Sequence, residues 1–223
     1  MLKDLIRANR SCRGYDENRK ITREELLELV DCARLTPSST NMQPLRYYLA
    51  WEKEEVDRIQ GLTKWAGALP QMELPHPGMR PTAFIVICQD TAVSASLAKF
   101  QKDVGIAAQT MLLAATEMGL GGCMIGNFQA GTLKAELGLP ESFAPLLVVA
   151  IGKPAEKIVL TEIKEGESTD YYRDENDVHY VPKRKLADIV FDKGQSGYSQ
   201  SASLLAHNRV AASQLIRSGL YHS

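Results

Sequence analysis

Apolar residues recur at helical spacing in several segments of the chain. Residues 2–9 form a short amphipathic candidate. A second helix begins after Thr22, because Glu25 follows three positions later in the arrangement of a capping box, and Pro37 stops its pattern. Residues 103–118 predict the strongest helix. It is apolar nearly all round and rich in glycine and alanine, which favours a subunit interface.

Short runs of β-branched and aromatic residues alternate with these helices and predict strands. The run AFIVIC at 83–88 has no polar interruption and is typical of a strand buried on both faces. Further strands are expected at 46–51, 121–125, 146–151 and 185–191, and a short helix at about 131–138. The alternation indicates an α/β or α+β layer fold.

Three segments break this pattern. Residues 53–82 hold four prolines after a predicted helix, and this long irregular crossing is where we expect substrate selectivity. Residues 153–185 are charged and aperiodic, with no expected core of their own, so we expect them to lie across a partner subunit. We therefore divide the chain into a domain at 1–192 and a serine-rich tail at 193–223, to which we assign no role.

Composition excludes several classes of protein. The 223 residues include 26 Lys+Arg and 27 Asp+Glu, a formal net charge of -1, so we expect neither nucleic acid nor membrane as a partner. No apolar run has the length of a signal peptide core or a membrane span, which favours the cytoplasm. The four cysteines are far apart, and neither a metal site nor a disulfide framework is expected.

Familiar catalytic and phosphate-binding motifs are absent. The glycine cluster GLGGCMIG fails the GxGxxG spacing, and neither GxxxxGK[ST], HExxH nor GxSxG occurs. What remains is the polar loop TPSSTNMQP at 36–44 and two basic clusters. These clusters are Arg10, Ser11 and Arg13 near the start, and Lys183 with Arg184 near the end. Together they predict a ligand with a phosphate at one end and a planar, acceptor-rich head at the other.

At this point the chain resembles a known family. RSCRGY, TPSSTNMQP, the segment DVGIAAQTMLLAATEMGLGGCMIGNF, LGLP with LLVVAIGKP, and VPKRKLADIVF follow one another as in the FMN-dependent nitroreductases. The resemblance covers about residues 2–191. It implies an α+β fold with a central mixed sheet flanked by helices. It further implies an intertwined homodimer whose C-terminal segment crosses to the partner, with one FMN in each of two interface clefts and NADH or NADPH as the electron donor.

The resemblance also assigns roles by position. Arg10, Ser11 and Arg13 are similar to the stretch that meets the FMN phosphate, ribityl chain and pyrimidine edge, and Lys183 and Arg184 to a C-terminal phosphate clamp. The flavin-lining loop, contributed largely by the partner, corresponds to Pro37, Ser38, Ser39, Asn41 and Gln43. Ile125 and Gly126 are similar to backbone neighbours of the redox face.

We expect Arg13 to act in catalysis, since its charge would stabilise the reduced flavin, which is anionic at N1. The expected activity is ping-pong reduction of nitroaromatics, quinones or related conjugated acceptors. The alternatives are an FMN-binding protein with little turnover, for storage or sensing, and a flavin-modifying relative. The chain departs from the family at Asn9, where an arginine is often found, and also at Leu45 and Met124, where aromatic residues are common; the Asn9 amide could still donate to phosphate but carries no charge.

Overall fold

The computed structural model describes residues 1–164 and 166–191, so the tail predicted at 193–223 lies outside the described residues. Two compact units are distinguished. The first comprises Met1–Thr161 with Ser168–Pro182, and the second comprises Glu162–Glu167 with the residues from Lys183 onward. The predicted domain at 1–192 stays a prediction.

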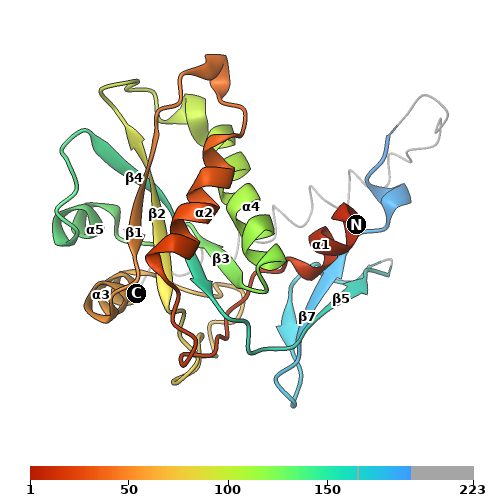
Figure 1. Ribbon diagram of the computed structural model, residues 1–223. Helices are drawn as coiled ribbons and strands as arrows, with labels where there is room; N and C mark the ends of the chain where they lie inside the picture. The colour runs from red at the N-terminus through yellow and green to blue at the C-terminus, as the bar shows by residue number, and fades with distance from the viewer. Residues whose placement is uncertain (165, 192–223) are drawn as a thin grey trace, which may run out of the picture. The chain divides into compact units, whose positions relative to one another are not determined.

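The first unit is built on a four-stranded sheet (Figure 1). Its order is β1 (Leu45–Ala50), β2 (Ala83–Asp90), β4 (Phe143–Gly152) and β3 (Gly121–Ile125), and every neighbouring pair is antiparallel. One isolated parallel bridge among the described residues, Ser11 with Gly122, joins this antiparallel sheet. This bridge lays the N-terminal segment along β3.

Helices cover both faces of this sheet (Figure 1). The helices are α1 (Leu2–Ala8), α2 (Arg23–Arg34), α3 (Lys53–Leu62), α4 (Gln101–Glu117) and α5 (Ala130–Glu136). One core cluster joins α2 and α4 to Ile85 and Ile87, and a second joins α3 and α5 to Phe84 and Val86. Because strand side chains alternate between faces, β2 contributes side chains to both core clusters. This confirms the prediction that β2 is buried on both faces.

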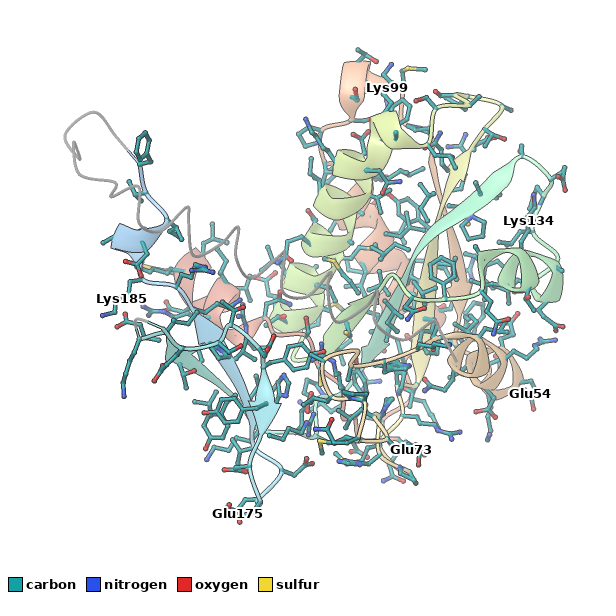
Figure 2. The ribbon with its side chains drawn as sticks, turned by 180° about the vertical axis from the view of Figure 1, so that it is seen from behind. Glu54, Glu73, Lys99, Lys134, Glu175 and Lys185 are labelled. Carbon is teal, nitrogen blue, oxygen red and sulfur yellow. The ribbon has the colours of Figure 1, made fainter. Side chains whose placement is uncertain are left out.

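Figure 2 views the ribbon from behind, where the labelled Glu54 and Lys134 mark α3 and α5.

Several local predictions are confirmed. Thr22 Oγ1 accepts from the Glu25 amide at 3.2 Å, and the Thr22 amide donates to Glu25 Oε2 at 2.9 Å, which completes the capping box. Gly119 follows α4 with φ of +72°, as a C-terminal glycine cap requires.

Gly122 explains how closely α4 approaches the sheet. A Cβ at this position would lie 2.2 Å from the Ala150 carbonyl oxygen and 2.6 Å from Leu112 of α4. No side chain fits there without moving the backbone of β4. The glycine thus fixes β3 against α4 and β4.

Residues 153–185, predicted to be aperiodic and without a core of their own, contain regular strands. They contain β5 (Ile158–Glu162), β6 (Tyr172–Arg173) and β7 (His179–Lys183), paired in the order β5-β7-β6. These strands are short and carry many charges, so their period is hidden in the sequence. The buried positions among them are held by ion pairs as well as by apolar packing.

The strand predicted at 185–191 is also wrong. Leu186–Asp188 form a 3₁₀ turn, and Leu186 and Phe191 are 74% and 73% exposed. The run is apolar, but no strand among the described residues pairs with it. None of the described helices is long and apolar enough to cross a bilayer.

Candidate functional site

The N-terminal strip, residues 10–15, has a backbone fixed from several sides. The Cys12 amide donates to the Gly122 carbonyl oxygen at 2.9 Å, and the Gly14 carbonyl oxygen accepts from the Ala155 amide at 2.9 Å. The fully buried Tyr15 donates its hydroxyl to the Cys12 carbonyl oxygen at 2.6 Å. The strip is therefore a rigid base for its side chains.

Arg13 is held by the hairpin of β6 and β7. Its guanidinium lies 4.7 Å from the centre of the Tyr171 ring, and Nη1 lies 3.4 Å from His179 Nε2. Nη1 also donates to the Ser11 carbonyl oxygen at 3.3 Å, and the backbone amide of Arg13 donates to Glu156. The Arg13 Nε atom is buried and has no hydrogen-bond partner among the described residues. This donor is therefore left unsatisfied by the described part of the chain.

A buried ion pair supports this arrangement. Arg173 and Glu156 are paired with side chains only 2% and 1% exposed. Arg173 also lies 3.0 Å from Asp177, which in turn lies 3.2 Å from His76 of the irregular segment. Partial burial raises the pKa of Asp177, but hydrogen bonds and charges from Arg173 and His76 outweigh it and leave this pKa below its ordinary value.

His179 is neutral at pH 7. Burial, followed by the positive charges of Arg13 and Arg173, lowers its pKa to about 4, against a smaller opposing effect of Asp177. An arginine can only donate, so Nε2 of the imidazole accepts from Arg13 and the proton lies on Nδ1. Nδ1 is buried, without a partner in the described part of the chain.

Arg10 and Ser11 lie at the start of the strip. Arg10 folds back on its own chain, with Nη2 donating to the Ile6 carbonyl oxygen at 2.9 Å, and partial burial lowers its pKa. It lines a pocket of about 240 Å³ together with Arg7 and Cys12. Ser11 is exposed. Both predicted residues are therefore at hand beside Arg13.

Asn9 has a structural role, which corrects the expectation that it could donate to phosphate. It is 7% exposed, and Nδ2 donates to the Leu112 carbonyl oxygen and to Thr116 Oγ1, each at 3.0 Å. Its oxygen accepts from Gln109 Nε2 at 3.1 Å. Because all three partners lie on α4, the amide ties the strip to that helix and no donor is left over.

The loop at 36–44 is anchored by one carboxylate. Asp103, which is 5% exposed in the first turn of α4, accepts from Ser38 Oγ at 2.6 Å and from the Ser39 amide at 3.0 Å. Ser38 Oγ in turn accepts from the Gln43 amide at 3.0 Å. The loop is thus held by a buried carboxylate, which sequence reasoning missed, in addition to its two prolines, of which Pro37 is exposed.

The tip of this loop has unusual backbone geometry. Thr40, Asn41 and Gln43 adopt φ of 52°, 54° and 52°, in the left-handed region. The side chains of Asn41 and Gln43 are exposed and hydrogen-bond to each other at 3.2 Å. Both side chains face solvent, whereas the backbone amides of Asn41 and Gln43 donate to the Ser38 carbonyl oxygen and to Ser38 Oγ.

Loop and strip lie at opposite ends of α4 within one chain. The loop contacts Asp103, whereas Asn9 contacts Leu112 and Thr116. Nine to thirteen residues of helix separate these contacts, about 14 to 20 Å along the axis. One chain therefore does not bring its own loop 36–44 to its own Arg13.

Ile125 and Gly126 lie at the end of β3. Ile125 is 4% exposed, and Gly126 is exposed with no atom within 4 Å of the place a Cβ would take. Gly126 thus has open space beside it at one end of β3, while the Ser11 bridge lies near the other end. A molecule lying along β3 would meet both.

Lys183 and Arg184 belong to the second unit, where Lys183 ends β7 and both side chains are exposed. The Lys183 carbonyl oxygen accepts from the Ile163 amide at 2.8 Å. Their predicted phosphate role stays a prediction.

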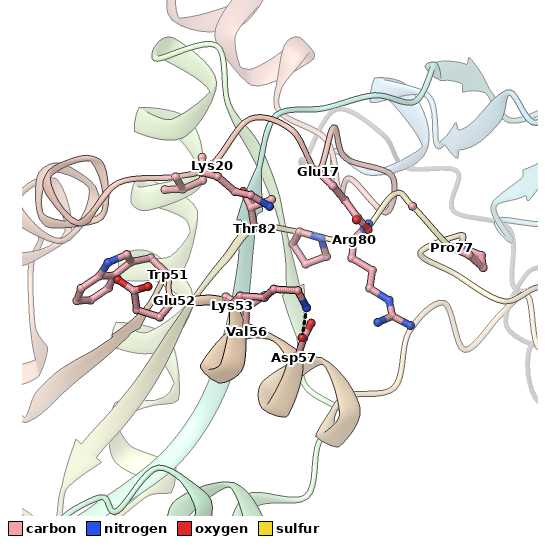
Figure 3. A pocket seen from close by; sticks show the side chains of 13 residues that line it. Glu17, Lys20, Trp51, Glu52, Lys53, Val56, Asp57, Pro77, Arg80 and Thr82 are labelled. Carbon is pink, nitrogen blue, oxygen red and sulfur yellow. Dashed lines mark hydrogen bonds and ion pairs between the residues drawn. The ribbon is translucent and has the colours of Figure 1, made fainter.

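A pocket of about 500 Å³ contains none of the predicted site residues (Figure 3). It lies between residues 17–21, the start of α3 and residues 77–82. Lys53 is paired with Asp57 in it, and Glu17 accepts from the Arg80 amide at 2.7 Å. Charges of both signs line its wall, which selects no class of ligand.

Metal and thiol chemistry find no support in the described residues, which hold no group of three or more potential metal ligands. All four cysteines are free, and Cys12, Cys88 and Cys123 are buried. Burial raises the pKa of all three thiols.

Sequence reasoning missed the residues that hold the predicted ones. They are Asp103, Glu156, Tyr171, Arg173 and His179. An acid in the first turn of an otherwise apolar helix was a signal for Asp103. The string DYYRDEND gave no comparable signal, because the contacts of Arg173 with Glu156 and of Tyr171 with Arg13 join distant positions and leave no local pattern.

The fold and the site define an α+β protein with a strip of basic and polar side chains beside the edge strand β3. The Nitroreductase family profile matches residues 6–153. The chain therefore belongs to the nitroreductase family, and the expectation of an oxidoreductase from this family is confirmed.

Two curated relatives illustrate the likeness. A protein of Archaeoglobus fulgidus, named as an NADH dehydrogenase/NAD(P)H nitroreductase, is 27% identical over 158 residues, 69% of this chain and 85% of its own length. The Cr(VI) reductase of a Pseudomonas strain is 26% identical over 221 residues, 91% of this chain and 86% of its own length.

A solved structure from Exiguobacterium sibiricum, a nitroreductase-like protein in complex with FMN, has a TM-score of 0.57 at 21% identity. It covers 70% of this chain and 89% of its own. At this identity the likeness concerns the fold alone.

Proposed function

We propose that the chain binds FMN and uses NADH or NADPH to reduce nitroaromatics, quinones or related conjugated acceptors in two alternating half-reactions. The observation that carries the proposal is Arg13, a guanidinium in the strip beside β3 whose Nε has no hydrogen-bond partner among the described residues. A donor of that kind fits the acceptor-rich pyrimidine edge of a flavin. Bound FMN would supply the hydride chemistry.

The residues of the strip would bind and orient this cofactor. Ser11 is exposed and can donate to the ribityl chain, and Arg10 lies at the phosphate end. Arg13 provides positive charge where negative charge develops on reduction. At the other end of β3, the open backbone at Gly126 leaves room for a flat ring and for a second flat molecule stacked on it.

The loop 36–44 would come from a second copy of the chain. Its distance along α4 from the strip of its own chain supports this assignment. Exposed apolar side chains on α1 and α4 support a homodimer, with Leu2 at 65%, Ile6 at 45% and Ile106 at 41% exposure. The partner's loop would then add its exposed Asn and Gln side chains to the ring. We also propose that the C-terminal segment crosses to the partner.

An anaerobic titration of the purified protein tests the proposal. We expect a yellow dimer with one FMN per chain whose absorbance bleaches on addition of NADH or NADPH and returns with a quinone. A colourless monomer that does not take up added FMN would contradict it. A bound flavin that stays oxidised would favour the alternative of a flavin-binding protein with little turnover.

Two substitutions test the assigned residues. Arg13→Ala should lower the reduction potential of bound FMN and slow its reduction by nicotinamide, because a stabilising charge is removed. Replacing Lys183 and Arg184 with alanine should weaken FMN more than riboflavin. Equal losses for both ligands would remove these two residues from the phosphate site.

A further inference from the structure

The partners of Arg13 have an electrostatic property in common. Neither side chain that touches its guanidinium carries a negative charge. Tyr171 contributes a ring face at 4.7 Å and His179 a neutral imidazole nitrogen at 3.4 Å. A carboxylate in either place would hold the guanidinium as firmly, but its charge would cancel the charge of Arg13 toward a ligand.

Glu156 is the carboxylate nearest to this arrangement in the described contacts. One oxygen accepts from the backbone amide of Arg13, and the other is paired with Arg173 in a fully buried contact. Since Arg173 supplies the compensating charge, the guanidinium of Arg13 is not drawn into an ion pair.

The hairpin that carries these groups is itself anchored. The Tyr171 ring packs with Trp65 and Met72 against the small core of the irregular segment, and its hydroxyl accepts from the Ala68 amide at 3.3 Å. Asp177 contacts His76 of the same segment. The hairpin can therefore fix the direction of Arg13.

We propose that Tyr171 and His179 form a neutral clamp, which positions Arg13 without cancelling its charge, while Arg173 keeps Glu156 from doing so. The clamp residues act through Arg13 and are positioning residues. The inference rests on the proposed function, since the charge kept free is the one that would face FMN. It goes beyond that function, because it assigns roles to residues outside the predicted site.

The apoprotein gives a first test without any flavin. Nitrogen NMR of His179 should report a neutral imidazole at pH 7 with its proton on Nδ1, because Nε2 must accept from Arg13. A charged ring, or a proton on Nε2, would overturn the clamp. This result is independent of whether FMN binds, so it separates failure of the clamp from failure of the proposed function.

The second test compares His179→Gln with His179→Glu, two side chains of almost equal size. The amide can still accept from Arg13 and is neutral, whereas the carboxylate brings the charge that the clamp excludes. We expect FMN to bind H179E at least about tenfold more weakly than H179Q, since a unit charge about 4 Å away in a protein site is worth more than a tenfold change. The potential of bound FMN should also be lower in H179E.

Asn176→Asp is the matched control. It makes the same change from amide to carboxylate at the exposed turn of the same hairpin, and it should leave FMN affinity and potential unchanged. Equal FMN affinity and potential in H179Q and H179E would overturn the proposal. Loss of FMN in H179Q as large as in H179E would also overturn it, because the role would then be purely structural.

Discussion

The N-terminal strip and the loop 36–44 lie at opposite ends of α4 and are held in opposite ways. The strip is fixed by backbone hydrogen bonds to β3 and to the chain after β4, and its arginine rests on neutral side chains. The loop is fixed by a single buried carboxylate, Asp103, and its tip is in the left-handed region at three residues.

The difference shows where each region keeps its free polar groups. In the strip, the backbone groups are hydrogen-bonded within the protein, and the charge of its arginine is not neutralised by the side chains that touch it. In the loop, the Ser38 side chain and the backbone amides of Asn41 and Gln43 are bonded within the loop, whereas the side chains of Asn41 and Gln43 are exposed. A charged group and a set of neutral hydrogen-bonding groups suit the two ends of one ligand, provided that they come from two chains.

The largest effect is expected from Arg173→Met, which tests how the strip is supported. This change leaves the buried carboxylate of Glu156 without its partner. Breaking a buried ion pair in this way lowers the free energy of unfolding by about 3 to 5 kcal/mol. Urea unfolding measures the loss. The double variant Glu156→Gln with Arg173→Met removes both charges and should recover most of it. If the two variants are equally unstable, the ion pair is not what supports the strip.

A somewhat smaller effect concerns acid and His179. The unfolded side chain binds a proton near pH 6.5 and the folded one near 4, because Arg13 and Arg173 face it from both sides and burial by Tyr171 and its neighbours removes water. Between these values the unfolded state binds more protons, so stability is fully present above pH 6.5 and is lost as pH falls toward 4.

The free energy of unfolding should fall by about 3 kcal/mol over this pH range, because a shift of one pKa unit corresponds to about 1.36 kcal/mol. His179→Gln should lack this loss between pH 6.5 and 4, while both proteins share the loss from Asp177, whose lowered pKa acts at lower pH. Unfolding curves at a series of pH values decide this. Identical pH profiles would show that His179 titrates in the folded protein as it does in the unfolded one.

Asp103→Ala should release the loop and lower the free energy of unfolding by about 2 kcal/mol. Two hydrogen bonds to a charged acceptor are lost, and their donors are left without a partner. Ser38→Ala is the control, because it removes one of these bonds and should cost about 1 kcal/mol. If D103A also abolishes FMN binding in a still folded dimer, the loop belongs to the cofactor site. Unchanged binding would separate the loop from it.

The sequence predicted the layers well, because their signals are local. The run 83–88 and the pair Thr22 and Glu25 each need only their neighbours to be read. It also predicted the strip and the loop, through resemblance. The supports of both could not be predicted. Glu156 and Arg173 face each other only once β5, β6 and β7 are formed, and Ser38 meets Asp103 across 65 positions.

The smallest prediction returns to the tip of the loop and has the opposite sign. Thr40 is β-branched and sits at φ of 52°, where a Cβ costs about 1 kcal/mol or more. Thr40→Gly should therefore stabilise the protein by about 0.5 to 1 kcal/mol, after the greater freedom of glycine in the unfolded chain is subtracted.

Thr40→Ala is the matched control, because it also removes the hydroxyl that donates to Ser39 but keeps the Cβ. A gain in T40G without a gain in T40A locates the strain in the backbone. Weaker FMN binding in the more stable T40G would mean that the loop keeps this geometry for the ligand, since stability and function would then diverge at the same residue.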